Sequence, residues 1–135
     1  MIKNFYLCVL VLFLFSCSKG DVTDLFNQKN QTITVSAFTY MPYITTDVIF
    51  QDINLGVGNG ALNVGMDLSP GQFSVEWSDA ETGTKFTSSN IIEIPESYNK
   101  QFLIIHIYPN RTVEAFFSDT YPKESPKGLH YLKKQ

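Results

Sequence analysis

The chain has 135 residues, of which 13 are acidic and 10 are basic, so its formal net charge is −3. This length suits a single domain. The acidic excess argues against binding of nucleic acid, whose phosphates attract a basic surface. The charge is uneven, because from Pro122 onward four lysines stand against one glutamate.

The first 16 residues have the pattern of a cleaved signal peptide. Met1-Ile2-Lys3-Asn4 is a short cationic segment, and an uncharged apolar run follows from Phe5 to Phe15. A run of this length is too short for a membrane-spanning helix, which needs about 20 apolar residues. Its length and cationic flank are those of the hydrophobic region of a signal peptide.

The end of this run predicts a lipid anchor. Leu14-Phe15-Ser16-Cys17 resembles the lipobox of bacterial lipoproteins, in which a small residue precedes the cysteine that is acylated. The resemblance implies that residues 1–16 are removed and that Cys17 becomes the lipidated N-terminus. The other cysteine, Cys8, lies in the removed segment, so the mature chain forms no internal disulfide and has no free thiol for catalysis. Residues 17–30 are polar and are predicted to be a flexible tether.

The remainder alternates apolar and polar residues with the period of strands. Thr32 to Ala37 alternates strictly and is rich in β-branched residues, which favour strands. Phe102-Leu103-Ile104-Ile105 is apolar at every position, which predicts a central strand covered on both faces. About seven short strands are expected, over residues 32–37, 47–55, 62–68, 73–77, 85–94, 101–108 and 111–117.

The turns between these segments complete the fold prediction. The glycine-rich stretch Gly56–Gly60 contains Asn59-Gly60, a pair typical of hairpins. Pro109-Asn110 is expected to turn the chain before its last strand. These features predict an all-β domain, β-sandwich-like, over residues 31–121. Residues 122–135, interrupted by two prolines, are expected to be a basic irregular tail.

No catalytic or metal-binding constellation stands out. His106 lies within the most apolar strand, where a buried imidazole bonded to a neighbour is a better account than a general base. His130 lies in the lysine-rich tail and is expected to be solvated, so zinc has no pair of ligands. Candidate acid–base carboxylates fall opposite the apolar positions of strands, as on a solvated sheet face: Asp52, Asp67, Glu76 and Glu93. We therefore expect no enzyme, no cofactor and no metal.

Aromatic residues offer the remaining candidate for binding. Tyrosine is enriched at protein interfaces. Tyr40-Met41-Pro42-Tyr43 lies where Pro42 interrupts a strand, so Tyr40, Met41 and Tyr43 are expected at a partner-binding surface, with Asn59 added from the glycine-rich loop. The alternative is that this segment plugs the end of the core. Trp77 alternates with Phe73 and Val75 and is expected in the core.

One stretch resembles a group of uncharacterised bacterial lipoproteins. It runs from Gly58 to Ala115 and contains Leu68-Ser69-Pro70-Gly71-Gln72-Phe73-Ser74-Val75-Glu76-Trp77 and Phe102-Leu103-Ile104-Ile105-His106-Ile107-Tyr108-Pro109-Asn110-Arg111-Thr112-Val113-Glu114-Ala115. The shared pattern is a glycine-rich hairpin, a Pro-Gly turn into a strand ending near Trp, and an apolar strand that turns into a Val-Glu strand. Some of these lipoproteins are thought to be periplasmic immunity proteins against phospholipase toxins delivered by type VI secretion. The resemblance therefore implies the same class of activity here.

Together these features predict a lipoprotein of the bacterial cell envelope. Its membrane contact is the lipid on Cys17. The outer membrane is expected rather than the inner one, because Ser18 follows the cysteine in place of the aspartate that retains some bacterial lipoproteins at the inner membrane. Its domain is expected in the periplasm or at the cell surface, where it binds another protein as an inhibitor of a membrane-attacking effector. The alternative is a structural or assembly role as an accessory lipoprotein of an envelope or secretion machine.

Overall fold

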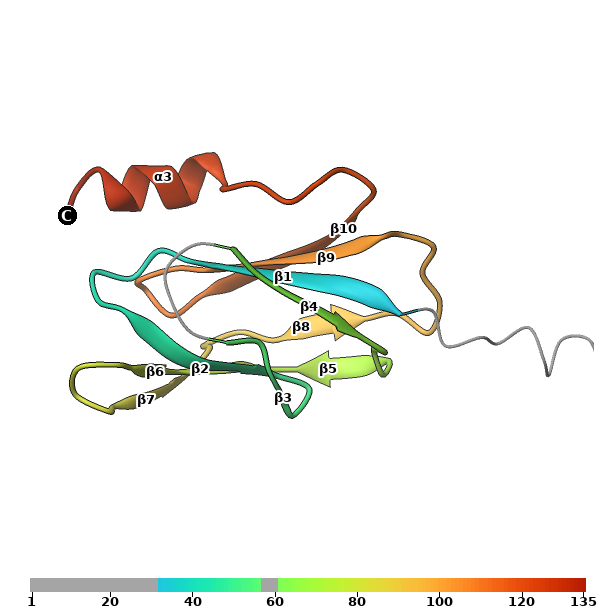
Figure 1. Cartoon of the computed structure of the whole chain (residues 1–135), viewed down its shortest axis with the longest axis horizontal. Helices are drawn as coiled ribbons and strands as arrows, with labels where there is room; N and C mark the ends of the chain where they lie inside the picture. The colour runs from blue at the N-terminus through green and yellow to red at the C-terminus, as the bar shows by residue number, and fades with distance from the viewer. Residues whose placement is uncertain (1–31, 57–60) are drawn as a thin grey trace, which may run out of the picture. The chain divides into compact units, whose positions relative to one another are not determined.

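The computed structural model describes residues 32–56 and 61–135 (Figure 1). The chain divides into two units, Met1–Asn30 and Gln31–Gln135, and the described residues all belong to the second. The predicted signal peptide, Cys17, the tether and Asn59 lie outside the described residues.

Two four-stranded sheets and one two-stranded sheet make up this unit. Sheet A has the order β10-β9-β1-β4, from Val113–Ser118, Phe102–Ile107, Ile33–Thr39 and Ala61–Met66. Sheet B has the order β3-β2-β6-β7, from Ile53–Asn54, Thr45–Phe50, Val75–Asp79 and Lys85–Thr87. Sheet C pairs β5 (Gly71–Phe73) with β8 (Ile92–Ile94). The prediction of an all-β domain is confirmed, with three open sheets.

The sheets share one hydrophobic core. Alternate residues of β1 and β9, such as Val35 and Ile105, are fully buried and cluster with Trp77 of β6 and Ile94 of β8. Because side chains alternate across a strand, the opposite parity of β9 faces away from this core. There Ile104 and His106 are also buried, beneath the C-terminal segment. Strand β9 is therefore central and covered on both faces, as its sequence predicts.

In two places the chain passes from one sheet to another within a stretch that its sequence predicts as a single strand. The predicted strand 85–94 is β7 in sheet B and then β8 in sheet C. Similarly, β5 joins sheet C and β6 joins sheet B, with Ser74 between them. The predicted strand 47–55 folds back on itself as β2 and β3, because Gln51 and Asp52 adopt positive φ angles of 49° and 61°. Seven predicted segments thus become ten described strands.

The hairpin predicted at Gly56–Gly60 is wrong. Before this stretch β3 pairs with β2, and after it β4 pairs with β1 in the other four-stranded sheet. The stretch therefore connects two sheets and does not join two neighbouring strands. Residues 57–60 themselves lie outside the described part of the chain.

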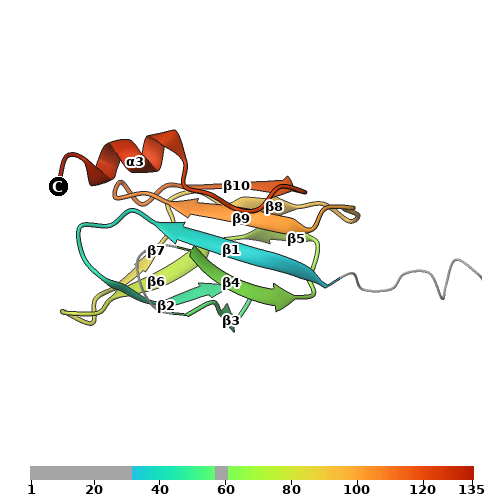
Figure 2. The same ribbon diagram turned by 45° about the horizontal axis from the view of Figure 1, so that its top comes forward.

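The prediction of an irregular tail is also wrong, because residues 126–132 form a helix. Helix α3 spans Pro126–Leu132, with Ser125 as its N-cap. The Ser125 hydroxyl oxygen accepts a hydrogen bond from the Gly128 N–H at 2.9 Å, and Pro126 occupies the first turn, where it needs no hydrogen-bond partner. Figures 1 and 2 show α3 on the side of sheet A that faces away from sheet B.

Candidate functional site

Of the predicted partner-binding residues, the three that the structure describes, Tyr40, Met41 and Tyr43, do not form an exposed surface. Tyr40 is 1% exposed and Met41 is 2% exposed, which corrects the expectation that they lie open to a partner. Tyr43 is half-buried, and its hydroxyl accepts a hydrogen bond from the Trp77 indole N–H at 3.2 Å. Trp77 itself is in the core, as predicted. The segment plugs the end of the core, which is the alternative that its sequence left open.

Tyr40 instead belongs to a buried polar network with His106. Its hydroxyl lies 2.8 Å from Nδ1 of His106 and accepts a hydrogen bond from the backbone N–H of Ser125, also at 2.8 Å. Burial raises the pKa of Tyr40 and lowers the pKa of His106, so both groups are uncharged near pH 7. The prediction of a buried His106 bonded to a neighbour is confirmed. His130 is exposed, as expected.

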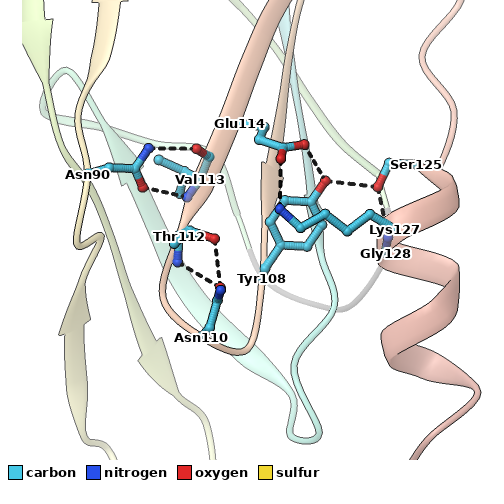
Figure 3. Close-up of polar contacts among 9 residues, drawn as sticks. All are labelled: Asn90, Tyr108, Asn110, Thr112, Val113, Glu114, Ser125, Lys127 and Gly128. Carbon is cyan, nitrogen blue, oxygen red and sulfur yellow. Dashed lines mark hydrogen bonds and ion pairs between the residues drawn. The ribbon is translucent and has the colours of Figure 1, made fainter.

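A second network fixes the start of α3 to strand β10 (Figure 3). The Tyr108 hydroxyl donates a hydrogen bond to Glu114 at 2.7 Å and lies 3.0 Å from the Ser125 hydroxyl. The other carboxylate oxygen of Glu114 accepts from Nζ of Lys127 at 2.7 Å, and this ammonium lies 4.1 Å from the centre of the Tyr108 ring.

The pKa shifts in this network favour a structural role. Burial raises the pKa of Tyr108 to about 12, and the hydrogen bond from Lys127 lowers the pKa of Glu114. The phenol therefore keeps its proton and the carboxylate stays ionised near neutral pH. Neither group is ready to exchange a proton with a substrate, so we assign the network to positioning of α3.

The predicted turn at Pro109-Asn110 is confirmed, and its polar side chains hold the neighbouring strands. The side-chain oxygen Oδ1 of Asn110 accepts hydrogen bonds from the N–H and the hydroxyl of Thr112, at 3.1 and 2.6 Å. Asn90 donates to and accepts from the backbone of Val113, at 2.8 Å each (Figure 3). These hydrogen bonds fix the turn and tie Asn90 to the first residue of β10.

The outer face of sheet B differs from that of sheet A in its shape and in its charge. A register shift between Thr46 and Ile49 distorts β2, and Asp47 has a positive φ of 48° in this bulge. The face is hollowed to about 310 Å³ beside the bulge. The hollow is lined by Asp47, Ile49, Glu76, Trp77, Ser78, Lys85, Phe86 and Thr87.

This face and its turns are strongly acidic. Asp47 and Asp52 lie on the β2–β3 segment, and the β6–β7 hairpin contributes Glu76, Asp79 and Glu81. Lys85 is the one cation in these two segments. We call the exposed side of β2, β6 and β7, together with the adjoining turns and strand end that carry Asp52, Asp79 and Glu81, the acidic face.

The carboxylates considered for acid–base chemistry are solvated. Asp52, Asp67, Glu76 and Glu93 are all exposed, as expected. Glu76 and Glu93 lie on strands, whereas Asp52 lies in the turn between β2 and β3 and Asp67 follows the end of β4. Within residues 32–56 and 61–135, no three side chains of the His, Cys, Asp and Glu types come together as a metal site would need. In the same part of the chain, no helix is long and apolar enough to cross a membrane.

The chain matches no protein-family model, no curated protein and no solved structure with which it was compared.

Proposed function

We propose that this chain is a lipid-anchored protein-binding module of the bacterial cell envelope, whose acidic face binds a basic protein partner. The anchor rests on the cationic and apolar N-terminus and on the lipobox-like sequence that ends at Cys17. Diacylation provides stable attachment, since two acyl chains bind a bilayer far more strongly than one. The proposed site of attachment is the outer membrane.

The architecture that we propose is β-sandwich-like. Sheet A forms one layer, and sheets B and C form the other. The support for this is the single core cluster to which all three sheets contribute buried residues, among them Ile33, Phe50 and Ile92. A sandwich presents two outer faces, and the two faces differ here.

The difference between the faces is the observation that carries the proposal. Helix α3 lies on the outer face of sheet A, where Tyr40, Tyr108 and Tyr131 belong to a second hydrophobic cluster. The outer face of sheet B carries no described helix, and it is hollowed beside the bulge at Asp47. An open, hollowed sheet face is a surface into which a side chain of another protein fits.

The charge of the acidic face specifies the kind of partner. Five carboxylates against one lysine produce a negative potential, whereas the C-terminal segment from Pro122 is basic. Complementary charge accelerates encounter and selects among partners. A partner with a basic surface therefore fits this face better than it fits the rest of the domain.

The resemblance to immunity lipoproteins supports a narrower form of the proposal. In that form the partner is a membrane-attacking effector, and the bound domain inhibits it. An anchor at Cys17 holds the inhibitor at the bilayer, where a phospholipase acts. The assembly role differs in its partners, which are subunits of an envelope or secretion machine.

Reversing one charge on the acidic face is expected to weaken partner capture. The mature domain, Ser18 to Gln135, serves as bait in envelope extracts, and captured proteins are identified and quantified by mass spectrometry. Glu76→Lys introduces a cation into the hollow, so recovery of the partner is expected to fall about tenfold. The dependence of that recovery on salt concentration is expected to weaken. Glu93→Lys makes the same change at the exposed position of strand β8 and is expected to leave recovery unchanged.

The number and identity of the captured proteins distinguish the inhibitor role from the assembly role. A single stoichiometric partner with lipase-like or toxin features supports the inhibitor role, and several envelope-machine subunits support the assembly role. Equal recovery by the wild-type domain and by both variants would contradict binding through the acidic face.

A further inference from the structure

The exposed side of helix α3 carries two leucines beside a lysine. Leu129 and Leu132 are 39% and 38% exposed, although leucine is among the residues most often buried. Residues three and four positions apart are neighbours on a helix surface, so Leu129 lies beside both Leu132 and Lys133. A leucine pair beside a cation is the pairing found on helices that lie in a membrane interface.

The opposite side of α3 is fixed to the domain, so the leucines stay partly open to solvent. Gly128 is buried against the ring of Tyr40, and the ring of Tyr131 lies with its centre 5.8 Å from that of Tyr108. Figures 1 and 2 show that the helix covers the side of sheet A that faces away from sheet B. The fold therefore presents the leucines and their lysine on its outside without any rearrangement.

The lysines of this segment make the same side of the domain basic. Lys127 is paired with Glu114 at 2.7 Å, whereas Lys123, Lys133 and Lys134 extend into solvent as exposed side chains. The acidic face lies on sheet B, in the other layer. The two outer faces of the domain therefore carry opposite charges.

The segment between β10 and α3 adds an exposed aromatic ring to the basic side. Tyr121 is 72% exposed, and its ring makes an edge contact with Phe102 at a centre-to-centre distance of 5.9 Å. A second hollow, of about 320 Å³, lies between this segment and sheet A, where Tyr121 and Lys123 line it together with Phe116 of β10. Tyrosine is enriched at membrane–water interfaces, because its ring is apolar and its hydroxyl is polar.

An anionic lipid surface fits this combination of side chains better than an acidic protein does. Leucines on a convex helix need an apolar layer only a few ångströms deep, which the boundary between headgroups and acyl chains provides. Lysines beside them extend their charged ends to the lipid phosphates, and each is attracted to an anionic leaflet.

We propose that the side of α3 that carries Leu129, Leu132 and Lys133, together with Lys134 and Tyr121, docks on a bilayer that contains anionic phospholipid. Because sheet B lies in the other layer, this docking turns the acidic face away from the negative headgroups and toward a protein partner. The inference rests on the proposed function for the lipid anchor, which keeps the domain at a membrane.

Paramagnetic NMR tests the docking on the isotope-labelled chain, isolated from cell membranes and held in nanodiscs. The nanodiscs contain phosphatidylglycerol and phosphatidylcholine in equal parts, with a trace of nitroxide-labelled phosphatidylcholine that broadens nearby amide signals. Amides of residues 126–135 are expected to be strongly broadened, and those of β6 and β7 are expected to keep their intensity. Nanodiscs of phosphatidylcholine alone are expected to broaden residues 126–135 much less, because they do not attract the lysines.

Three variants assign the docking to the proposed surface. Lys133→Ala with Lys134→Ala removes two exposed lysines and is expected to lower the ratio of docked to undocked domain about 25-fold, about fivefold for each lysine. Leu129→Gln replaces an exposed apolar side chain and is expected to lower that ratio about tenfold. Lys85→Ala removes an exposed lysine from the acidic face and is expected to leave the ratio unchanged.

The outcomes separate this surface from the anchor. A chain that stays with the anionic nanodiscs while its α3 signals remain sharp would overturn the docking alone and would favour an acidic protein as the partner of α3. Equal broadening of α3 and of the β6–β7 hairpin, or no effect of the paired lysine substitutions, would also overturn it. A chain absent from both kinds of nanodisc would overturn the docking and the anchor together.

Discussion

Replacing Trp77 by alanine is expected to lower the free energy of unfolding by about 3–5 kcal/mol. The side chain is 1% exposed and lies among core residues from all three sheets. Its ring stacks on Phe86 with centres 6.0 Å apart, and its indole N–H donates to the Tyr43 hydroxyl. Truncation removes the buried area, leaves a large cavity and deprives the Tyr43 hydroxyl of its hydrogen-bond donor. Urea unfolding followed by circular dichroism measures the change.

The neighbouring strand offers a matched control for this loss. Thr87 is exposed on β7, so Thr87→Ala is expected to change the free energy of unfolding by no more than about 0.5 kcal/mol. A loss below about 1 kcal/mol for Trp77→Ala would contradict the placement of this side chain in the shared core.

Replacing Gly128 by alanine is expected to destabilise the domain by about 1–3 kcal/mol, as overpacking does. Gly128 is buried in α3, and a Cβ atom placed on it meets the ring of Tyr40 far inside van der Waals contact. That ring cannot give way easily, because Tyr40 is 1% exposed and its hydroxyl is bonded to His106 and Ser125. The helix must therefore move away from sheet A.

The sign of the Gly128→Ala effect is diagnostic. Alanine is a better helix former than glycine by about 1 kcal/mol, so a helix free of sheet A would gain stability from the substitution. His130→Ala changes an exposed position of the same helix and is expected to have little effect. Hydrogen exchange at the amides of residues 125–135 locates the loss. A Gly128→Ala variant that is more stable than the wild-type chain would contradict the docking of α3 on Tyr40.

Strands that lie wholly within one sheet were predictable from the local pattern of apolar and polar residues. The unbroken apolar run at Phe102–Ile105 indicates a strand covered on both faces, and the structure agrees. The alternation from Thr32 to Ala37 predicts a strand but not its burial, because β1 is buried on both faces from Val35 onward. Alternation does not say which strand lies alongside. The exchange of sheets at Ser74 and the crossover after β3 were therefore missed, because pairing is decided by contacts distant in the sequence.

The helix and the polar networks were missed for a related reason. Pro126 suggested an irregular tail, yet proline is favourable in the first turn of a helix, and Ser125 directly before it was the available signal. The buried position of His106 was predictable from its apolar strand. Its partner Tyr40 was not, because 66 residues separate them. Tyr40 was mistaken for a surface residue, since a tyrosine beside a proline fits an interface as well as a plug.

The two hollows could not be found in the sequence at all. Each is lined by residues from separate strands, such as Asp47 with Lys85, or Phe116 with Tyr121 beyond the end of its strand. The acidic balance of the chain was evident from composition. Its concentration on sheet B became visible only once β2, β6 and β7 were placed together.

The lipid anchor is the claim on which the proposed function depends first, and the mass of the mature N-terminal peptide tests it most directly. The chain is isolated from cell membranes and digested, and the peptide that contains Cys17 is measured by mass spectrometry. We predict that the mature chain begins at Cys17 and carries a diacylglyceryl group, and that Cys17→Ser abolishes both the modification and the cleavage. A mature chain that begins elsewhere, or an unmodified Cys17, would contradict the anchor and the envelope location built on it.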